Sequence, residues 1–188
     1  DQVDGQGTGE LLLFELASPL WAPEITVDWM SYSEALRIEA RFNSLTGLRS
    51  FYLSNPFAPY PAADPGGTLL GASIVSIATV GADNASVSLT GLPAGYALTE
   101  GDFFHVDFGA NPVRRGLFQL SEPGVADITG TTPELAVFPH LWTGVTAGLA
   151  VSLAYPSAKC ILVPGAITNA TFSRSRAEGM TFSCVQRL

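Results

Sequence analysis

The sequence predicts a mainly β protein, an antiparallel β-sandwich or barrel with one α-helix at about residues 33–46 and a β-rich insertion. Three observations lead to this fold class. Alternating apolar and polar segments recur at spacings of about 8 to 15 residues, which is typical of sandwiches and barrels. Turn-forming residues separate these segments, with 19 Gly and 13 Pro among 188 residues. One segment alone combines a helix-capping signal with apolar residues at helical spacing.

The N-terminal part begins with a polar, Gly-rich stretch at residues 1–9, which predicts an extended arm. Residues 11–16 are nearly all apolar. After two prolines, residues 24–29 alternate, so that Ile25, Val27 and Trp29 share one face. This pattern predicts a half-buried strand with Trp29 in the core.

The helix prediction depends on the capping box Ser31-Tyr32-Ser33-Glu34. In such a box the Ser hydroxyl and the Glu carboxylate each accept a backbone N–H that the first helical turn leaves unpaired. Gly47 is expected to end the helix in a left-handed conformation. The apolar residues between these signals recur at helical spacing: Ala35, Ile38, Phe42 and Leu45.

The remaining chain consists of strand and turn signals. Residues 49–54 predict a strand, and four prolines between positions 56 and 65 predict a long turning loop. Residues 75–90 predict a hairpin whose turn is Gly81–Asn84. Further strands are expected at 102–108, 116–121, 134–138, 150–155, 159–163, 166–172 and 180–186.

Changes in composition divide the chain into three parts. Turn-rich segments near Pro65–Gly67 and Pro156–Lys159 mark the boundaries. Residues 1–66 are expected to form the N-terminal part of a sandwich that includes the helix. Residues 67–156 form a β-rich middle region, which would be an insertion, and residues 157–188 supply strands that return to the first sandwich.

The composition favours a folded protein that buries surface in an assembly. Apolar residues make up 47% of the chain and charged residues only 14%, which excludes disorder for most of its length. With so few charges, contiguous apolar patches on the surface are expected. The net charge of −8 also makes a nucleic-acid groove lined by Lys and Arg improbable. Small basic clusters at Arg114-Arg115 and at Arg174 with Arg176 leave local binding open.

A membrane span is not expected. Residues 135–158 contain no Asp, Glu, Lys or Arg, and the length of this stretch matches a transmembrane helix. However, Pro139, Gly144, Gly148 and Pro156 interrupt it.

The residues needed for catalysis or metal binding lack the usual spacings. His105 and His140 are the two histidines, and no serine lies in a G-x-S-x-G motif. His105 and Asp107 share one strand face, where a polar exposed face explains them as well as catalysis does. Cys160 and Cys184 are expected to be buried free thiols, with a single disulfide as the alternative. We therefore expect no catalytic, cofactor or metal site and no enzyme activity, although a glycosidase-type carboxylate pair stays open.

Aromatic residues provide an alternative function. Exposed rings can stack on sugars, and Trp142, next to a Pro-His-Leu turn, and Tyr60 are the candidates for such a platform. The alternative to a structural role is therefore a carbohydrate-binding β-sandwich module that recognises a bacterial surface glycan.

Two sequence blocks resemble known proteins. They are FYLSNPFAPYPAADPGGTLLG at residues 51–71 and LTGLPAGYALTEGDF at residues 89–103. Both are similar to tail proteins of long-tailed bacteriophages and prophages, in particular the distal-tail or baseplate proteins near the tail tip, which also occur in phage-like gene transfer particles. Further similar blocks are residues 7–21, 139–145 and 162–186.

The resemblance implies a structural virion protein without catalytic residues. In such relatives a β-sandwich with a helix assembles into a ring that joins the tail tube to the baseplate hub and the host-recognition apparatus. It implies a homo-oligomer, as a hexameric ring, whose partners are the tail tube protein, the baseplate hub and other tail-tip proteins. The expected location is the phage tail tip, after synthesis in the host bacterial cytoplasm.

Overall fold

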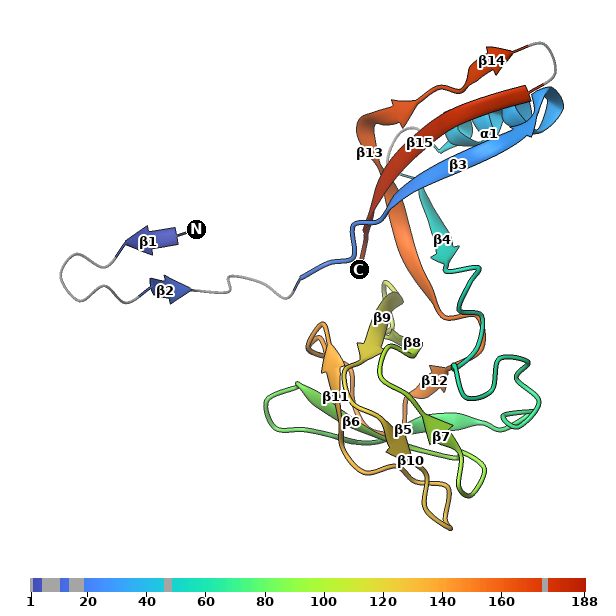
Figure 1. The fold of residues 1–188 in the computed structure, drawn as a ribbon. Coiled ribbons are helices and arrows are strands. Elements are labelled where there is room, and N and C mark those ends of the chain that lie inside the picture. Colours follow the sequence, from blue (N-terminus) through green and yellow to red (C-terminus); the bar gives the residue numbers. More distant parts are fainter. Residues whose placement is uncertain (1, 5–10, 14–18, 46–48, 174–175) are drawn as a thin grey trace.

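The computed structural model describes residues 2–4, 11–13, 19–45, 49–173 and 176–188. Strands make up 45% of the chain and helix 8%, which confirms the predicted mainly β fold with one helix. Figure 1 shows two bodies: a closed six-stranded antiparallel barrel and a curled sheet, which we call the half-barrel sheet. Each body has its own hydrophobic core.

The half-barrel sheet combines strands from both ends of the chain. Its neighbours are, in order, β3 (Glu24–Ser31), β15 (Arg176–Gln186), β13 (Ser157–Thr168) and β4 (Ser50–Ser54). The short β14 (Thr171–Ser173) pairs with the start of β15. All these pairings are antiparallel, and α1 (Tyr32–Ser44) packs on one face of the sheet.

The capping box is formed as predicted. Ser31 is the N-cap, and its Oγ accepts the N–H of Glu34 at 3.3 Å. In return, the Glu34 carboxylate accepts the N–H of Ser31 at 2.9 Å. The helix ends at Ser44 with Leu45 as its C-cap, while Gly47, the predicted stop, lies outside the described residues. The predicted apolar face is confirmed, because Ala35 and Phe42 are buried and Ile38 and Leu45 pack on the same core.

Trp29 is not a core residue, so its predicted placement is wrong. Its side chain is 65% exposed, whereas its neighbour Met30 is buried. The alternation changes phase in both paired strands, with Asp28 and Trp29 exposed in β3 and Glu178 and Gly179 exposed in β15. Gly179 has φ = +75°, a left-handed conformation that breaks the regular pleat. The break leaves the Trp29 side chain exposed to solvent.

Residues 159–172 also differ from the prediction of two separate strands. β13 is one long strand from Ser157 to Thr168, with a shift in register between Leu162 and Ile167 where it pairs with β15. The sequence Val163-Pro164-Gly165 lies at this shift and produces an irregularity rather than a chain reversal. Only the last predicted residues form a separate strand, β14.

The barrel contains β5 (Val75–Val80), β6 (Ser86–Thr90), β8 (Phe103–Phe108), β9 (Arg114–Leu120), β11 (Leu135–Phe138) and β12 (Ala150–Ser152). It closes in the order β11-β6-β5-β12-β8-β9. The predicted hairpin is confirmed as β5 and β6. Phe104 and Phe118 are fully buried in its centre, with ring centroids 5.4 Å apart. The short β7 (Ala97–Leu98) and β10 (Gly124–Val125) pair with each other.

Near the N-terminus one short strand lies within the predicted arm and pairs with a second strand in the apolar segment that follows it. β1 (Gln2–Asp4) pairs with β2 (Leu11–Leu13) in an antiparallel sheet of its own. The rest of the predicted arm, residues 1 and 5–9, lies outside the described residues.

All six barrel strands lie between β4 and β13 in the sequence. These two strands are neighbours in the half-barrel sheet, and Ser54 is the direct pairing partner of Ser157. The chain therefore leaves the sheet, builds the barrel and returns beside the point where it left.

Candidate functional site

Arg115 connects the barrel to the half-barrel sheet. From β9, its Nε and Nη2 donate to the two oxygens of Asp107 at 2.6 and 2.7 Å. Its Nη1 donates to Ser157 Oγ on β13 at 3.0 Å, and the guanidinium lies 4.5 Å from the ring centre of Tyr52 on β4. The hydrogen bond with Arg115 lowers the pKa of Asp107, so both groups are charged at neutral pH.

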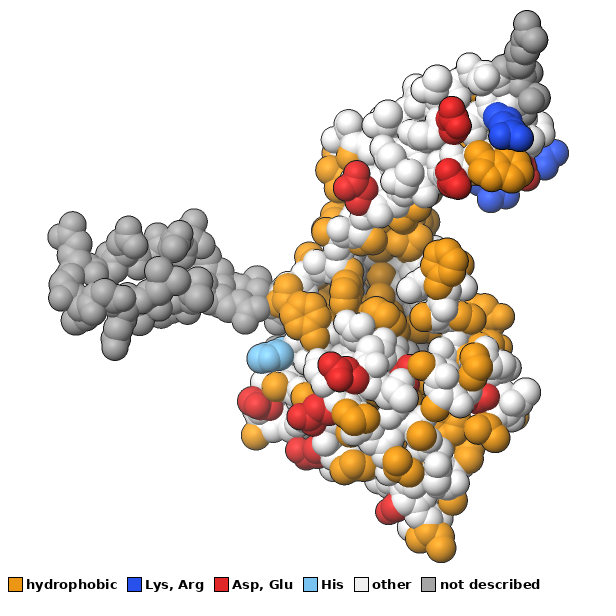
Figure 2. Space-filling model, viewed as in Figure 1, with side chains coloured by type: hydrophobic (Ala, Val, Ile, Leu, Met, Phe, Trp, Pro, Cys, Tyr) orange, Lys and Arg blue, Asp and Glu red, His pale blue; other side chains and the backbone are white. Residues whose placement is uncertain are grey.

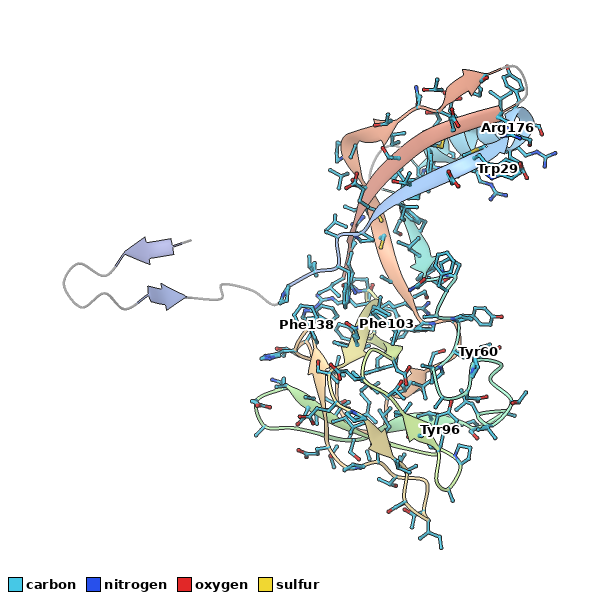
Figure 3. The ribbon with its side chains drawn as sticks, viewed as in Figure 1. Trp29, Tyr60, Tyr96, Phe103, Phe138 and Arg176 are labelled. Atoms are coloured by element: carbon cyan, nitrogen blue, oxygen red, sulfur yellow. The ribbon has the colours of Figure 1, made fainter. Side chains whose placement is uncertain are left out.

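A second set of contacts reinforces this junction. The Trp21 indole N–H donates to the carbonyl of Leu117 at 2.9 Å, and the amide of the buried Gln186 donates to the carbonyl of Arg115 at 3.3 Å. The Trp21 ring also meets Phe103 and Phe138 edge to face, each at 5.7 Å. These two phenylalanines belong to the barrel and lie near the half-barrel sheet (Figure 3). The two bodies are therefore joined by specific contacts as well as by the chain.

His105 is part of this junction through its contact with Ser157 on β13. Its Nδ1 accepts the backbone N–H of Ser157 at 3.3 Å, which places the proton of the neutral ring on Nε2. Burial and the nearby Arg115 cation lower the pKa of His105 to about 4, although Asp107 acts in the opposite direction. The Asp107 carboxylate is engaged by Arg115 instead. These contacts give His105 and Asp107 a structural role at the junction.

The lowered pKa of His105 predicts a specific pH dependence of stability. An unfolded chain protonates this histidine as the pH falls below about 6.5, whereas the folded protein resists protonation until about pH 4. The free energy of unfolding should therefore decrease as the pH falls from about 6.5 to about 4. In urea unfolding at pH 7 and pH 4.5, His105→Gln, whose amide oxygen can still accept the Ser157 N–H, should show a smaller decrease than the wild type. An equal decrease in both proteins would contradict a buried neutral His105.

Cys160 and Cys184 lie on the neighbouring strands β13 and β15. Both are free and buried, which confirms their predicted burial. A hydrogen bond with Cys184 together with burial raises the pKa of the Cys160 thiol, so this thiol stays protonated. His105 lies at the junction and His140 is exposed. Within the described ranges, no three His, Cys, Asp or Glu side chains are grouped to hold a metal ion.

Trp142 is not the exposed platform that the sequence predicts. It is half-buried, stacks on Phe108 at 6.4 Å and lies 5.0 Å from the ring of Phe118. Gly116 makes room for it, since a Cβ at this position would approach the Trp142 ring to 2.7 Å. Trp142 therefore closes the barrel core, and Tyr60 is the remaining aromatic candidate.

The half-barrel sheet has two unpaired edges in the described part of the chain. There β3 pairs with β15 alone and β4 pairs with β13 alone. Such edges present free backbone N–H and C=O groups that can pair with another chain. Sequence reasoning missed which strands these edges would be. The alternation of each strand was visible, but the order of strands in the sheet was not.

The sheet face opposite α1 is mostly polar. The register of the paired strands places Thr26 beside Thr181 and Glu24 beside Ser183. Small hydroxyl side chains predominate on this face, and α1 does not cover it. Its residues are Glu24, Thr26, Ser50, Tyr52, Ser54, Lys159, Ile161, Thr181, Ser183 and Val185.

Charge is distributed unevenly between the two bodies. Residues 55–156 carry eight acids and two bases, a net charge of −6, whereas residues 19–54 and 157–188 carry five acids and seven bases, a net charge of +2. Figure 2 shows Lys and Arg side chains at one end of the half-barrel sheet and acidic side chains on the barrel. A contact between the sheet of one copy and the barrel of another would bring opposite charges together.

A shallow groove of about 340 Å³ lies between β3 and α1. Trp29, Arg37 and Arg41 line it, and the guanidinium of Arg176 lies 5.6 Å from the ring centre of Trp29. Of the second predicted basic cluster, Arg176 is thus engaged with an aromatic ring, and Arg174 lies outside the described residues. Exposed Trp and Arg side chains are typical of the central residues of protein interfaces.

Comparison with protein-family models gave no match, and neither did comparison with curated protein sequences. In the described part of the chain, no helix has the length and apolar character needed to cross a membrane.

Proposed function

We propose that this chain is a structural protein of a bacteriophage tail, the distal tail adaptor ring that joins the tail tube to the baseplate hub and the host-recognition apparatus. The observation that carries the proposal is the curled half-barrel sheet with unpaired edges at β3 and β4. The sequence blocks that resemble distal-tail proteins support the same function. They cover both the loop after β4 and the barrel.

The two edges favour a ring rather than a dimer. They are different strands on opposite sides of one sheet, so pairing β3 of one copy with β4 of the next is a heterologous contact. A heterologous contact repeats until the rotation closes, and the curl of the sheet supplies that rotation. The resemblance leads us to propose six copies.

The two faces of the sheet fit such a ring. One face is covered by α1 and forms the core, while the face with Thr26, Thr181 and Ser183 is mostly polar and is not covered by α1. In the proposed ring the polar face lines the lumen and α1 lies outside. The chain acts by assembly, as a non-enzymatic subunit.

A crosslinking experiment tests the ring. Thr26 and Ser50 are exposed residues on opposite edges of the sheet, and the native cysteines are buried. The double variant Thr26→Cys/Ser50→Cys, treated with a short bismaleimide, should give a ladder of covalent species that ends at the closed ring. We expect the ladder to end at six subunits in denaturing gels and in mass photometry.

The single variants are the matched controls. Thr26→Cys alone and Ser50→Cys alone should give no ladder, because a heterologous contact brings unlike edges together. A covalent dimer from either single variant would indicate a symmetric contact and contradict the ring. Absence of crosslinking in the double variant at concentrations where the wild type self-associates would also contradict it.

The position in the tail has its own test. Antibodies against this chain, applied to a lysate of the source and imaged by immunogold electron microscopy, should label the distal tip of tailed particles. Label along the tube or at the neck would support a structural virion protein but contradict its position at the distal tip. Soluble protein without labelled particles would overturn the proposal.

A further inference from the structure

A groove of about 240 Å³ lies on the barrel side of the molecule, and no step of the ring proposal uses it. We call it the Phe57 groove. One wall is the loop after β4, with Phe57 and Tyr60. The other wall is the turn before β8, with Glu100 and Asp102, together with Phe103 at the start of β8. Figure 3 shows Tyr60 on this loop and Phe103 on the barrel.

Asp102 ties the two walls together. One carboxylate oxygen accepts the N–H of Ala62 at 2.8 Å, and the other accepts the N–H of Thr99 at 2.7 Å. The side chain is 5% exposed, so these bonds are shielded from water. The distance between the walls is therefore set by a buried carboxylate.

Asp64 holds the loop in the same manner. Its carboxylate accepts the backbone N–H groups of Thr68 and Leu70, each at 2.9 Å, and the hydroxyl of the buried Tyr96 at 3.4 Å. Asp64 itself is buried. A loop fixed by two buried carboxylates forms a preorganised site, in which binding costs little ordering of the protein.

The aromatic side of the groove faces solvent. Phe57 is 95% exposed, and its N–H donates to the Asn55 side-chain oxygen at 3.0 Å in a local turn. This turn holds the chain that presents the ring. Tyr60 packs edge to face against Tyr155 at 5.2 Å. A phenyl ring left in water beside a preformed groove is a surface available for a ligand.

The polar side of the groove contains hydrogen-bond acceptors and no base. Glu100 is exposed, and the described residues offer it no hydrogen-bond or ion-pair partner. The groove lies on a body of net charge −6, which disfavours polyanionic ligands. A complementary ligand therefore donates hydrogen bonds to the carboxylate and covers the phenyl ring with an apolar face.

We propose that the Phe57 groove binds a neutral sugar unit of a glycan. The apolar face of the sugar ring stacks on Phe57, and its hydroxyls donate to the Glu100 carboxylate. A cationic side chain is the other ligand of suitable charge, but cation recognition typically surrounds the ion with several aromatic faces. Of the three aromatic rings that line this groove, Phe57 is almost fully exposed, whereas Tyr60 and Phe103 are half-buried. A flat sugar ring fits this geometry better.

The test uses the full chain on an array of bacterial surface polysaccharides, followed by titration with the neutral oligosaccharide that gives the strongest signal. Phe57→Ala should weaken binding at least about tenfold, as the loss of a central aromatic contact does, and Glu100→Gln about threefold. Ile128→Ala is the matched control, because Ile128 is 92% exposed and lies outside the groove, and it should bind as the wild type does. Circular dichroism of each variant checks the fold.

Three outcomes would overturn this site. The array could show no binding of neutral glycans, or Phe57→Ala could leave the titrated affinity unchanged. In the third, Phe57→Ala weakens self-association in sedimentation and leaves glycan binding intact, which would make the groove a contact between copies. Ring formation is measured separately by crosslinking, so failure of the sugar site leaves the ring proposal unaffected.

Discussion

Phe42→Ala is expected to lower the free energy of unfolding by about 3 to 5 kcal/mol, as buried Phe truncations do. Phe42 is the large residue of α1 in the core of the half-barrel sheet, 8% exposed, and its ring centre lies 4.5 Å from that of Phe182. Alanine suits a helix, so the expected loss comes from packing rather than from helix propensity. Urea unfolding followed by far-UV circular dichroism measures it.

Leu36→Ala is the matched control for this substitution. Leu36 lies on the same helix and is 43% exposed, so its truncation should cost less than about 1 kcal/mol. A loss of similar size in both variants would mean that α1 unfolds locally. A loss below about 1 kcal/mol for Phe42→Ala would mean that this helix face does not pack on the sheet.

Gly130→Ala should destabilise the barrel by about 3 kcal/mol. Gly130 has φ = +79°, and a Cβ at this position would lie 2.1 Å from the carbonyl oxygen of Leu92. The two residues are held at this distance because the Leu92 N–H donates to the Gly130 carbonyl at 3.1 Å. The Cβ is fixed directly to the backbone of residue 130 and would meet a backbone oxygen, so no side-chain rotation can relieve the contact. Thermal and urea unfolding measure the loss.

Gly95→Ala separates the cost of the left-handed backbone conformation from the cost of the close Cβ contact. Gly95 also has a positive φ, +74°, but a Cβ there would meet no atom within 4 Å. The Gly95→Ala substitution should lower the free energy of unfolding by about 1 kcal/mol, which is the cost of the left-handed conformation alone. Equal losses in the two variants would refute the close contact at Gly130.

Local signals predicted the elements that depend on neighbouring residues. The capping box at Ser31 and Glu34 and the spacing of the apolar residues placed α1 to within two residues at each end. The hairpin of β5 and β6 was equally visible, because turn residues separate two alternating segments. In these segments the sequence close by determines the structure.

The errors arose where distant residues decide the outcome. Trp29 is exposed because β3 follows a phase change at Gly179, a partner far away in the sequence. Trp142 is half-buried because Gly116 leaves space for its ring. The alternation of β3 does not indicate its pairing with Gly179, and the turn beside Trp142 does not indicate the space at Gly116.

The candidate surfaces depend on the same long-range pairing. The strand order that leaves β3 and β4 as edges follows from β13 and β15 entering between them. Likewise, the Phe57 groove exists because Asp102 meets Ala62, a contact between two segments that the pattern of strands does not connect. The composition predicts that an assembly buries apolar surface, and this stays a prediction.

The pairing of Ser54 with Ser157 has a consequence for how such a protein can change. In an antiparallel pair, opposite Cα atoms lie about 5 Å apart, so the barrel is attached at what would otherwise be a hairpin turn. Any module whose two ends lie that close can occupy this position without altering the register of the sheet. A tight turn could replace it as well. The half-barrel sheet and the barrel can therefore change independently of each other, so that a barrel with a different surface can be carried on an unchanged sheet.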